Sequence, residues 1–412
     1  MIRPIASRGG SPAIDTILLV QWNFIGGYMM NRRLCLTFAV LALLLGAPAH
    51  GAKRKLVTNL ETVEGALLKH LLDEPDAAGK IALMESFAAK YPAHESTTWI
   101  LGELQTAYCK ASQFDRAIGA GVAILSKDPD DIIIANANLK AAEGAGNPLL
   151  IRQWAITTSI TARRLITAFR PADPEGAAAW QADVDYSKQV ETYCDYAIYA
   201  LALQAGDLTQ RVELADMLKR HSPASPYIAL LRQQLFIAFQ QAGHHARALA
   251  LAEEDIKTNA NNEDMLLYAA SKAYERQEKS KVTIYARRLL DTLPAKPAPP
   301  GINEPDWARN KAMKLGLAHW MLGIIASNEH RWPDADAHLR AALPNIGYQK
   351  GIAAEALYHL GMANHRIGDA RNDKNRIIES IRFNQQCAML AGNFQAQAKQ
   401  NVVSLRSQYH IQ

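Results

Sequence analysis

Four side chains that could bind zinc lie close together in the sequence: His330, Asp334, Asp336 and His338. Imidazole and carboxylate groups are both ligands that Zn²⁺ accepts, and a structural site needs four of them. Pro333, however, suits the first turn of a helix, where its missing N–H costs nothing. Asp334 suits the same turn, because a carboxylate interacts favourably with the helix dipole there. We therefore interpret the group as the start of a helix and expect no metal site.

The remaining candidate pairs are His244-His245, His359 with His365, Glu253-Glu254, and Asp130-Asp131. The first falls in an expected turn, and the second pair would lie on different faces of one helix. The carboxylates occupy solvated positions and do not face each other across a substrate, as hydrolysis would require. The sequence contains no glycine-rich phosphate loop, G-x-S-x-G elbow, H-E-x-x-H motif or C-x-x-C spacing. These features predict a protein that is not an enzyme and holds no cofactor.

Composition and charge indicate a folded protein that does not bind nucleic acid. Hydrophobic residues make up 49% of the chain, as in ordinary globular proteins. Four arginines and one aspartate fall in residues 1–52, which lowers the net charge of the remainder from +5 to +2. Nucleic-acid binding normally requires a pronounced basic surface. We therefore expect no nucleic-acid partner.

A leader sequence begins at Met30. Arg32-Arg33 forms a positive region, Leu34–Leu45 is an apolar run, and Ala47-Pro48-Ala49 supplies the small residues that signal peptidase requires. The run is shorter than the roughly 20 residues that span a bilayer. Cys35 lies at the start of the run and does not follow it, so it cannot be the cysteine of a lipoprotein.

We therefore expect residues 30–52 to be a cleavable signal peptide and the protein to be periplasmic or secreted, with no membrane span after cleavage. Residues 1–29 fit no part of a signal peptide, and we interpret them as an upstream extension that is not native. Three cysteines would remain: Cys109, Cys194 and Cys387. An odd number at wide spacing is not a disulfide framework, although the sequence leaves open whether any two of them pair.

Internal repeats decide the expected fold. Pairs of amphipathic helices joined by short turns recur in windows 98–131, 229–262, 263–296 and 316–349, and again from about residue 354. The clearest unit carries Leu322, Gly323, Ala335, Leu339 and Ala342, with small residues where the two helices must approach closely.

This pattern resembles the tetratricopeptide-repeat (TPR) family, and in particular exported bacterial TPR proteins of unassigned function. The resemblance implies an all-α fold in which 34-residue helix pairs stack into a right-handed superhelix, an α-solenoid. Residues 140–225 match the pattern poorly, and we interpret them as degenerate or elongated repeats. They include a helix that starts at Asn147-Pro148 and one long helix over Trp180–Ala205.

A proline-rich stretch divides the expected array. Residues 294–305 contain five prolines and predict an extended linker. The linker would separate an N-terminal superhelix, 53–293, from a C-terminal block, 306–412. We expect Trp307 to open the next helix, with Asp306 as its cap. We expect Phe394–Tyr409 to form a solvated capping helix at the end of the array.

The TPR resemblance also implies a binding groove lined by the first helix of each pair. In the family, five positions of that helix tend to face the ligand. In this sequence they correspond to Gln233, Ile237, Gln240, Tyr274, Trp320, Ile324, Tyr358, Met362 and His365. The Lys, Asn and Arg set with which some TPR proteins clamp a peptide carboxylate is missing.

We therefore predict a non-catalytic scaffold whose aromatic and amide-lined groove holds a protein or peptide partner. A glycan-binding protein of the cell envelope is the first alternative, because aromatic rings stack on sugars, and an unrecognised enzyme is the second. For Trp320 and Tyr358, simple packing between repeats is an equally good interpretation.

Overall fold

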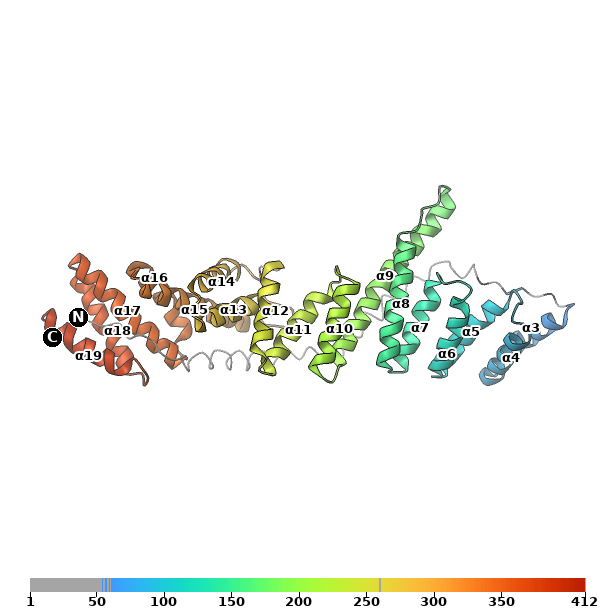
Figure 1. The fold of residues 1–412 in the computed structure, drawn as a ribbon, viewed down its shortest axis with the longest axis horizontal. Coiled ribbons are helices and arrows are strands. Elements are labelled where there is room, and N and C mark those ends of the chain that lie inside the picture. The colour runs from blue at the N-terminus through green and yellow to red at the C-terminus, as the bar shows by residue number, and fades with distance from the viewer. Residues whose placement is uncertain (1–53, 55, 58, 60, 259–260, 412) are drawn as a thin grey trace. The chain divides into compact units, whose positions relative to one another are not determined.

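The computed structural model describes residues 54, 56, 57, 59, 61–258 and 261–411, and their regular secondary structure is helical throughout (Figure 1). The expected signal peptide and upstream extension lie outside these residues. The described chain forms two compact units, which divide at Ala238 and Phe239. We call them the N-terminal unit and the C-terminal unit. The division falls inside helix α11, whereas the sequence placed its block boundary at 294–305.

The N-terminal unit begins with four short helices that form two pairs. The unit contains α3 (Val63–Asp73), α4 (Ala77–Lys90), α5 (Thr97–Lys110), α6 (Phe114–Leu125), α7 (Ile132–Gly144), α8 (Pro148–Ile166), α9 (Pro174–Gln204), α10 (Leu208–His221) and most of α11 (Tyr227–Gln241). In Figure 1 the end of α8 and the start of α9 project beyond the neighbouring α7. The structure thus confirms one long helix where the repeat pattern fails.

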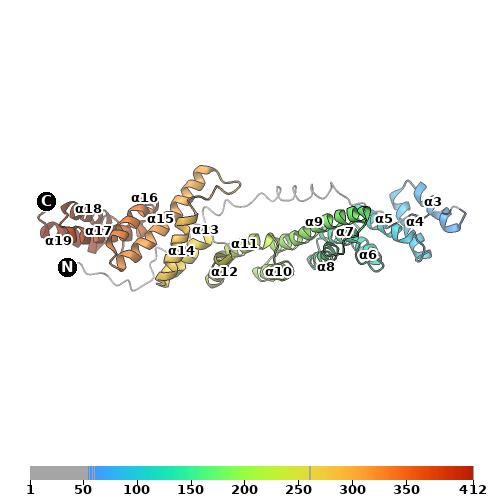
Figure 2. The same ribbon diagram turned by 90° about the horizontal axis from the view of Figure 1, so that it is seen from above.

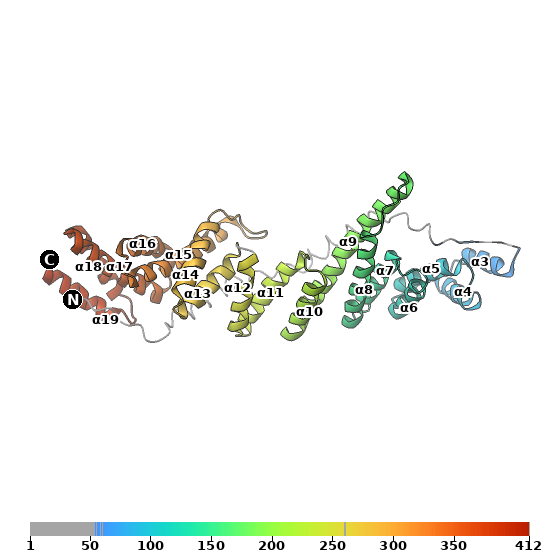
Figure 3. The same cartoon turned by 45° about the horizontal axis from the view of Figure 1, so that its top comes forward.

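The C-terminal unit consists of helices that pack on their neighbours in sequence, as a stack of helix pairs requires (Figure 3). It contains α12 (His245–Thr258), α13 (Glu263–Glu275), α14 (Lys279–Thr292), α15 (Glu304–Asn328), α16 (Trp332–Ile346), α17 (Lys350–Arg371), α18 (Lys374–Ala388) and α19 (Gln395–Gln408). The two units together confirm the expected all-helical fold, in which helices pack on their neighbours in sequence. No helix among the described residues has both the length and the apolar character needed to cross a bilayer.

Asparagine side chains cap the starts of α8 and α15. Asn147 Oδ1 accepts hydrogen bonds from the backbone N–H groups of Leu149 and Leu150, directly before the proline that opens α8. The start of α15 differs from the prediction. Its cap is Asn303, whose Oδ1 accepts from the Asp306 N–H at 2.9 Å. The helix therefore begins at Glu304, because a proline in the first turn is compatible with a helix.

The proline-rich segment is attached to α15 by hydrogen bonds. The indole Nε1 of Trp307 donates to the Lys296 carbonyl at 3.1 Å, and Lys311 Nζ donates to the same oxygen at 3.0 Å. Trp307 itself is 2% exposed. Figure 2 shows this segment as the loop between α14 and α15. Within the C-terminal unit the linker is thus a packed loop.

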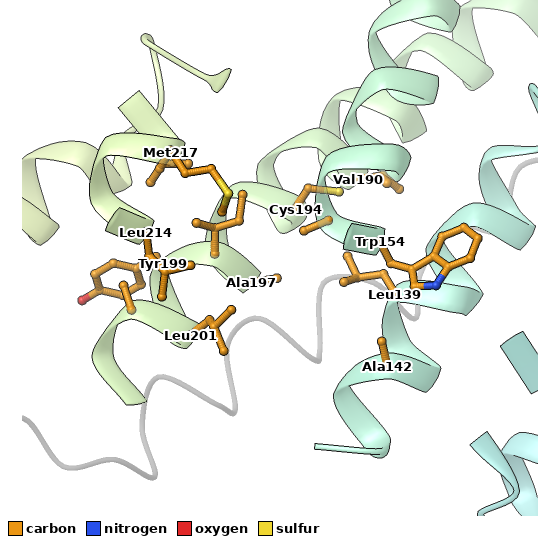
Figure 4. Packing of buried hydrophobic residues seen from close by; sticks show 14 of the residues in the cluster. Leu139, Ala142, Trp154, Val190, Cys194, Ala197, Tyr199, Leu201, Leu214 and Met217 are labelled. Atoms are coloured by element: carbon orange, nitrogen blue, oxygen red, sulfur yellow. The ribbon is translucent and has the colours of Figure 1, made fainter. Parts of the chain in front are cut away.

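The core of the N-terminal unit explains why residues 140–225 depart from the repeat pattern. Large side chains from α7 to α10 pack together there, including Leu139, Trp154, Val190 and Met217 (Figure 4). A 34-residue repeat has to hold two helices and their turns. The 31-residue helix α9, which contacts both α8 and α10, is too long for that spacing.

Arg163 ties three of these helices together. Its guanidinium donates to Glu191 Oε1 on α9 at 2.6 Å, to the His221 carbonyl at 2.7 Å and to Ser222 Oγ at 2.5 Å. A planar guanidinium can satisfy three acceptors at once, so this residue fixes the end of α10 relative to α8 and α9.

Small residues allow α15 and α16 to approach closely, as the repeat pattern predicts. A Cβ atom added at Gly323 would lie 2.5 Å from Leu339 Cγ, which is closer than atoms can pack. Ala335 is fully buried, in a cluster with Ala326 and Ala363.

Replacing Ala335 with tyrosine should therefore lower the free energy of unfolding by at least about 1–3 kcal/mol, because the ring has no space beside α15. Chemical denaturation followed by circular dichroism measures the change. A variant as stable as the wild type would show that the crossing of α15 and α16 is not tightly packed.

Candidate functional site

The nine predicted groove residues fall into two groups by exposure. Five are buried: Trp320, Ile324, Tyr358, Met362 and His365. Four are partly exposed: Gln233, Ile237, Gln240 and Tyr274. Gln233 and Ile237 belong to the N-terminal unit, and the other seven belong to the C-terminal unit. The nine residues therefore do not form one site within one unit.

The two predicted aromatic anchors pack against neighbouring helices. Trp320 is 1% exposed, and its ring centroid lies 4.9 Å from that of Tyr274 on α13. Tyr358 is 2% exposed and lies 5.0 Å from the ring of Phe394. These contacts agree with the alternative interpretation, in which Trp320 and Tyr358 pack between repeats. Binding of a ligand by the predicted groove residues stays a prediction.

The two histidines of α17 also have partners within the fold. His359 Nδ1 lies 2.8 Å from Ser327 Oγ on α15. Burial lowers the pKa of His359 to about 4, so the imidazole is neutral at pH 7. His365 Nε2 lies 3.2 Å from the hydroxyl of Tyr409. Both histidines therefore join helices of the C-terminal unit.

The zinc candidates are dispersed. Asp334 pairs with Arg331, and Asp336 accepts hydrogen bonds from Arg340 and Arg376. His338 faces His319. Nowhere in the described part of the chain do three His, Cys, Asp or Glu side chains gather as metal ligands. The sequence left open whether any two of the three cysteines pair. In the structure Cys109, Cys194 and Cys387 all carry free thiols.

Glu355 is a carboxyl that the sequence reading missed. Its Oε1 accepts a hydrogen bond from the Tyr274 hydroxyl at 3.4 Å. Loss of water around the carboxyl raises its pKa to about 7, although the hydrogen bond from Tyr274 acts in the opposite sense. The signal was available, since Glu355 is at position 2 of the repeat that begins near Ala354, three residues before Tyr358.

A raised carboxyl pKa predicts a defined pH dependence of stability. The folded state holds the Glu355 proton up to a pH of about 7, and the unfolded chain loses it near 4.5. The free energy by which protonated Glu355 stabilises the fold is therefore fully present below pH 4.5, and it is lost as the pH rises towards 7. Glu355→Gln should be more stable than the wild type at pH 8, by about 1–3 kcal/mol, with no such gain at pH 4. Equal gains at both pH values would contradict the assignment.

The N-terminal unit contains a group of tyrosines on and beside α9, which we call the tyrosine cluster: Tyr193, Tyr196, Tyr199 and Tyr227. Residues three apart on a helix are neighbours on its surface, so the first three lie in succession along α9. Their centroids are 6.2 Å and 6.3 Å apart. Tyr227 of α11 stacks on Tyr199 at 5.3 Å and lies 5.7 Å from Tyr196. Only Tyr199 is buried, and the other three rings are partly exposed.

Polar groups of α7 border the tyrosine cluster. The Tyr193 hydroxyl donates to Glu143 Oε2 at 2.5 Å. Burial raises the pKa of the Glu143 carboxyl and, together with that carboxyl, the pKa of the Tyr193 hydroxyl. Two turns nearer the start of α9, outside the cluster, the hydroxyl of Tyr186 accepts from the buried Asn136 Nδ2 at 3.3 Å. The arrangement combines apolar ring faces with a carboxyl that a hydrogen bond holds in place.

The chemistry of the tyrosine cluster suits recognition better than catalysis. Tyrosine rings offer large contact areas at low cost in conformational entropy, and their hydroxyls can hydrogen-bond a partner. Sequence reasoning missed the cluster because no repeat register could be assigned to residues 140–225. The spacing of Tyr193, Tyr196 and Tyr199 was its only signal.

No model of a protein family matches this chain, and no curated protein sequence matches it either. Among solved structures it is similar to the crystal structure of the P58(IPK) TPR domain, with 10% identity and a TM-score of 0.25. That match covers 84% of this chain and 97% of the other. The chain is also similar to yeast Tom70, with 9% identity and a TM-score of 0.21, over 86% of this chain and 97% of the other.

Proposed function

We propose that the protein is an exported, non-catalytic scaffold that binds a protein or peptide partner through the tyrosine cluster. The observation that carries this proposal is a chain of contacting tyrosine rings, of which only Tyr199 is buried and the other three are partly exposed. Interfaces draw most of their binding energy from a few such side chains, with tyrosine and tryptophan prominent among them. Export is proposed from the leader at residues 30–52.

The border of the cluster supports a peptide as the ligand. The Glu143 carboxyl lies beside the ring of Tyr193, is partly exposed, and can accept a hydrogen bond from an N–H group of an extended backbone. Ile237, a predicted groove residue, is partly exposed on the same α11 helix as Tyr227.

Selection from a displayed peptide library tests this proposal. The full protein without its leader is immobilised, an enriched peptide is synthesised, and its Kd is measured by fluorescence anisotropy. Tyr196→Ser should raise the Kd by about 30-fold, which corresponds to about 2 kcal/mol. Tyr348→Ser is the matched control, because Tyr348 is 55% exposed and lies in the C-terminal unit. It should leave the Kd unchanged.

Two outcomes would overturn the proposal. The first is an equal effect of both substitutions, which would place the peptide elsewhere. The second is a chain that enriches no peptide but retains oligosaccharides on a glycan array. That result would favour the glycan-binding alternative.

A further inference from the structure

A second surface lies in the C-terminal unit, where α18 and α19 enclose an open groove of about 550 Å³. We call it the terminal groove. Its principal lining residues are Arg382, Gln385, Met389, Lys399, Val402 and Val403. The sequence predicted a solvated capping helix over Phe394–Tyr409, and α19 occupies Gln395–Gln408. The terminal groove, however, exists only because α18 and α19 lie side by side.

The terminal groove has exposed apolar side chains on both of its sides. Met389, at the end of α18, is 80% exposed, and Val403 of α19 is 70% exposed. Two other residues of α19 are already buried in the fold, Ala398 against α17 and α18 and Leu405 against α18. Large apolar side chains left in water on both walls of one groove indicate a contact surface. Methionine adds flexibility, which suits a surface that adapts to another side chain.

The charge around the terminal groove has one sign. Residues 380–411 contain Arg382, Lys399 and Arg406 but no Asp or Glu. Arg382 and Lys399 are both exposed, and neither forms an ion pair with any residue that the structure describes. The preceding acid, Glu379, is bound by Arg340 of α16 and by Arg376 of its own helix, α18. The groove therefore presents two cations with no carboxylate to neutralise them.

We propose that the terminal groove docks an acidic amphipathic helix of a partner protein. The apolar stripe of that helix would lie between Met389 and Val403, as in other helix-in-groove complexes. Its carboxylates would pair with Arg382 and Lys399, which selects acidic partners over basic ones and speeds their association. This surface is independent of the tyrosine cluster, so the chain would carry one partner site in each unit.

The test uses the full chain without its leader and a labelled helical peptide of about 15 residues, built from Leu, Ala and Glu. A second peptide carries Lys at every Glu position. The wild type should bind the acidic peptide only. The double variant Arg382→Glu with Lys399→Glu should bind the acidic peptide at least about tenfold more weakly and should gain binding of the basic one. Met389→Ser should weaken binding of the acidic peptide without changing the preference for charge.

Two controls separate this surface from general charge and from the tyrosine cluster. Lys279→Glu reverses an exposed cation in the first turn of α14, where an acid is compatible with the helix, and should leave binding unchanged. Tyr196→Ser should also leave it unchanged, so failure of either proposal is distinguishable from failure of the other. Equal binding of the acidic peptide by wild type and double variant would overturn the docking proposal. So would capture of anionic phospholipid vesicles but not of the peptide.

Discussion

Replacing Asp336 with alanine is expected to lower the free energy of unfolding by about 2–4 kcal/mol. The Asp336 carboxylate is 7% exposed and accepts from Arg340 Nε at 2.8 Å, Arg376 Nη1 at 3.0 Å and Asn364 Nδ2 at 2.6 Å. It therefore joins α16 to α17 and α18. Removing one member of a buried charged group commonly costs about 3–5 kcal/mol. Both guanidinium groups keep about a third of their exposure, which reduces the expected loss.

The control for Asp336 is Glu379→Ala. Glu379 contacts the same two arginines but is 37% exposed, so its removal should cost about 1 kcal/mol or less. Denaturation midpoints of both variants, followed by circular dichroism, give the comparison. Equal losses for the two substitutions would show that burial of Asp336 is not what makes it important.

Trp320→Ala is expected to lower the free energy of unfolding by about 3–5 kcal/mol. The indole is almost fully buried and packs against Tyr274, so its removal leaves a cavity between α13 and α15. Tyr348→Ala, at an exposed ring, should change stability by less than about 0.5 kcal/mol. A Trp320→Ala variant with unchanged stability and lost partner binding would instead support the predicted groove in the C-terminal unit.

Much of the fold could be predicted from the sequence because its signals are local. Asn147-Pro148 marks the start of α8, and the long helix α9 follows from an unbroken run without turn residues. The crossing at Gly323 and Ala335 follows from residue size at a fixed spacing. The start of α15 was placed at Trp307 because Asp306 is a good cap, yet Asn303 also caps and Pro305 does not prevent a first turn.

The candidate sites could be predicted only where the repeat register was clear. That register located Tyr274 and Trp320, but it could not indicate that the indole of Trp320 is covered. The tyrosine cluster lies where no repeat register could be assigned. It also includes Tyr227 of α11, which contacts the rings of α9 although α10 separates the two helices in the sequence. The terminal groove forms where α18 packs on α19. The amphipathic pattern of each helix shows which of its faces is buried, but it does not show how the two helices lie against each other.

Photo-crosslinking from the tyrosine cluster tests the central claim most directly. A photoreactive phenylalanine analogue is placed at position 196 in one sample and at position 348 in another. Each sample is irradiated with the library-selected peptide and analysed by mass spectrometry. We expect a peptide adduct from position 196 and none from position 348. Adducts from position 348 alone, or from neither position while the peptide still binds, would contradict the assignment of the tyrosine cluster as the partner-binding surface.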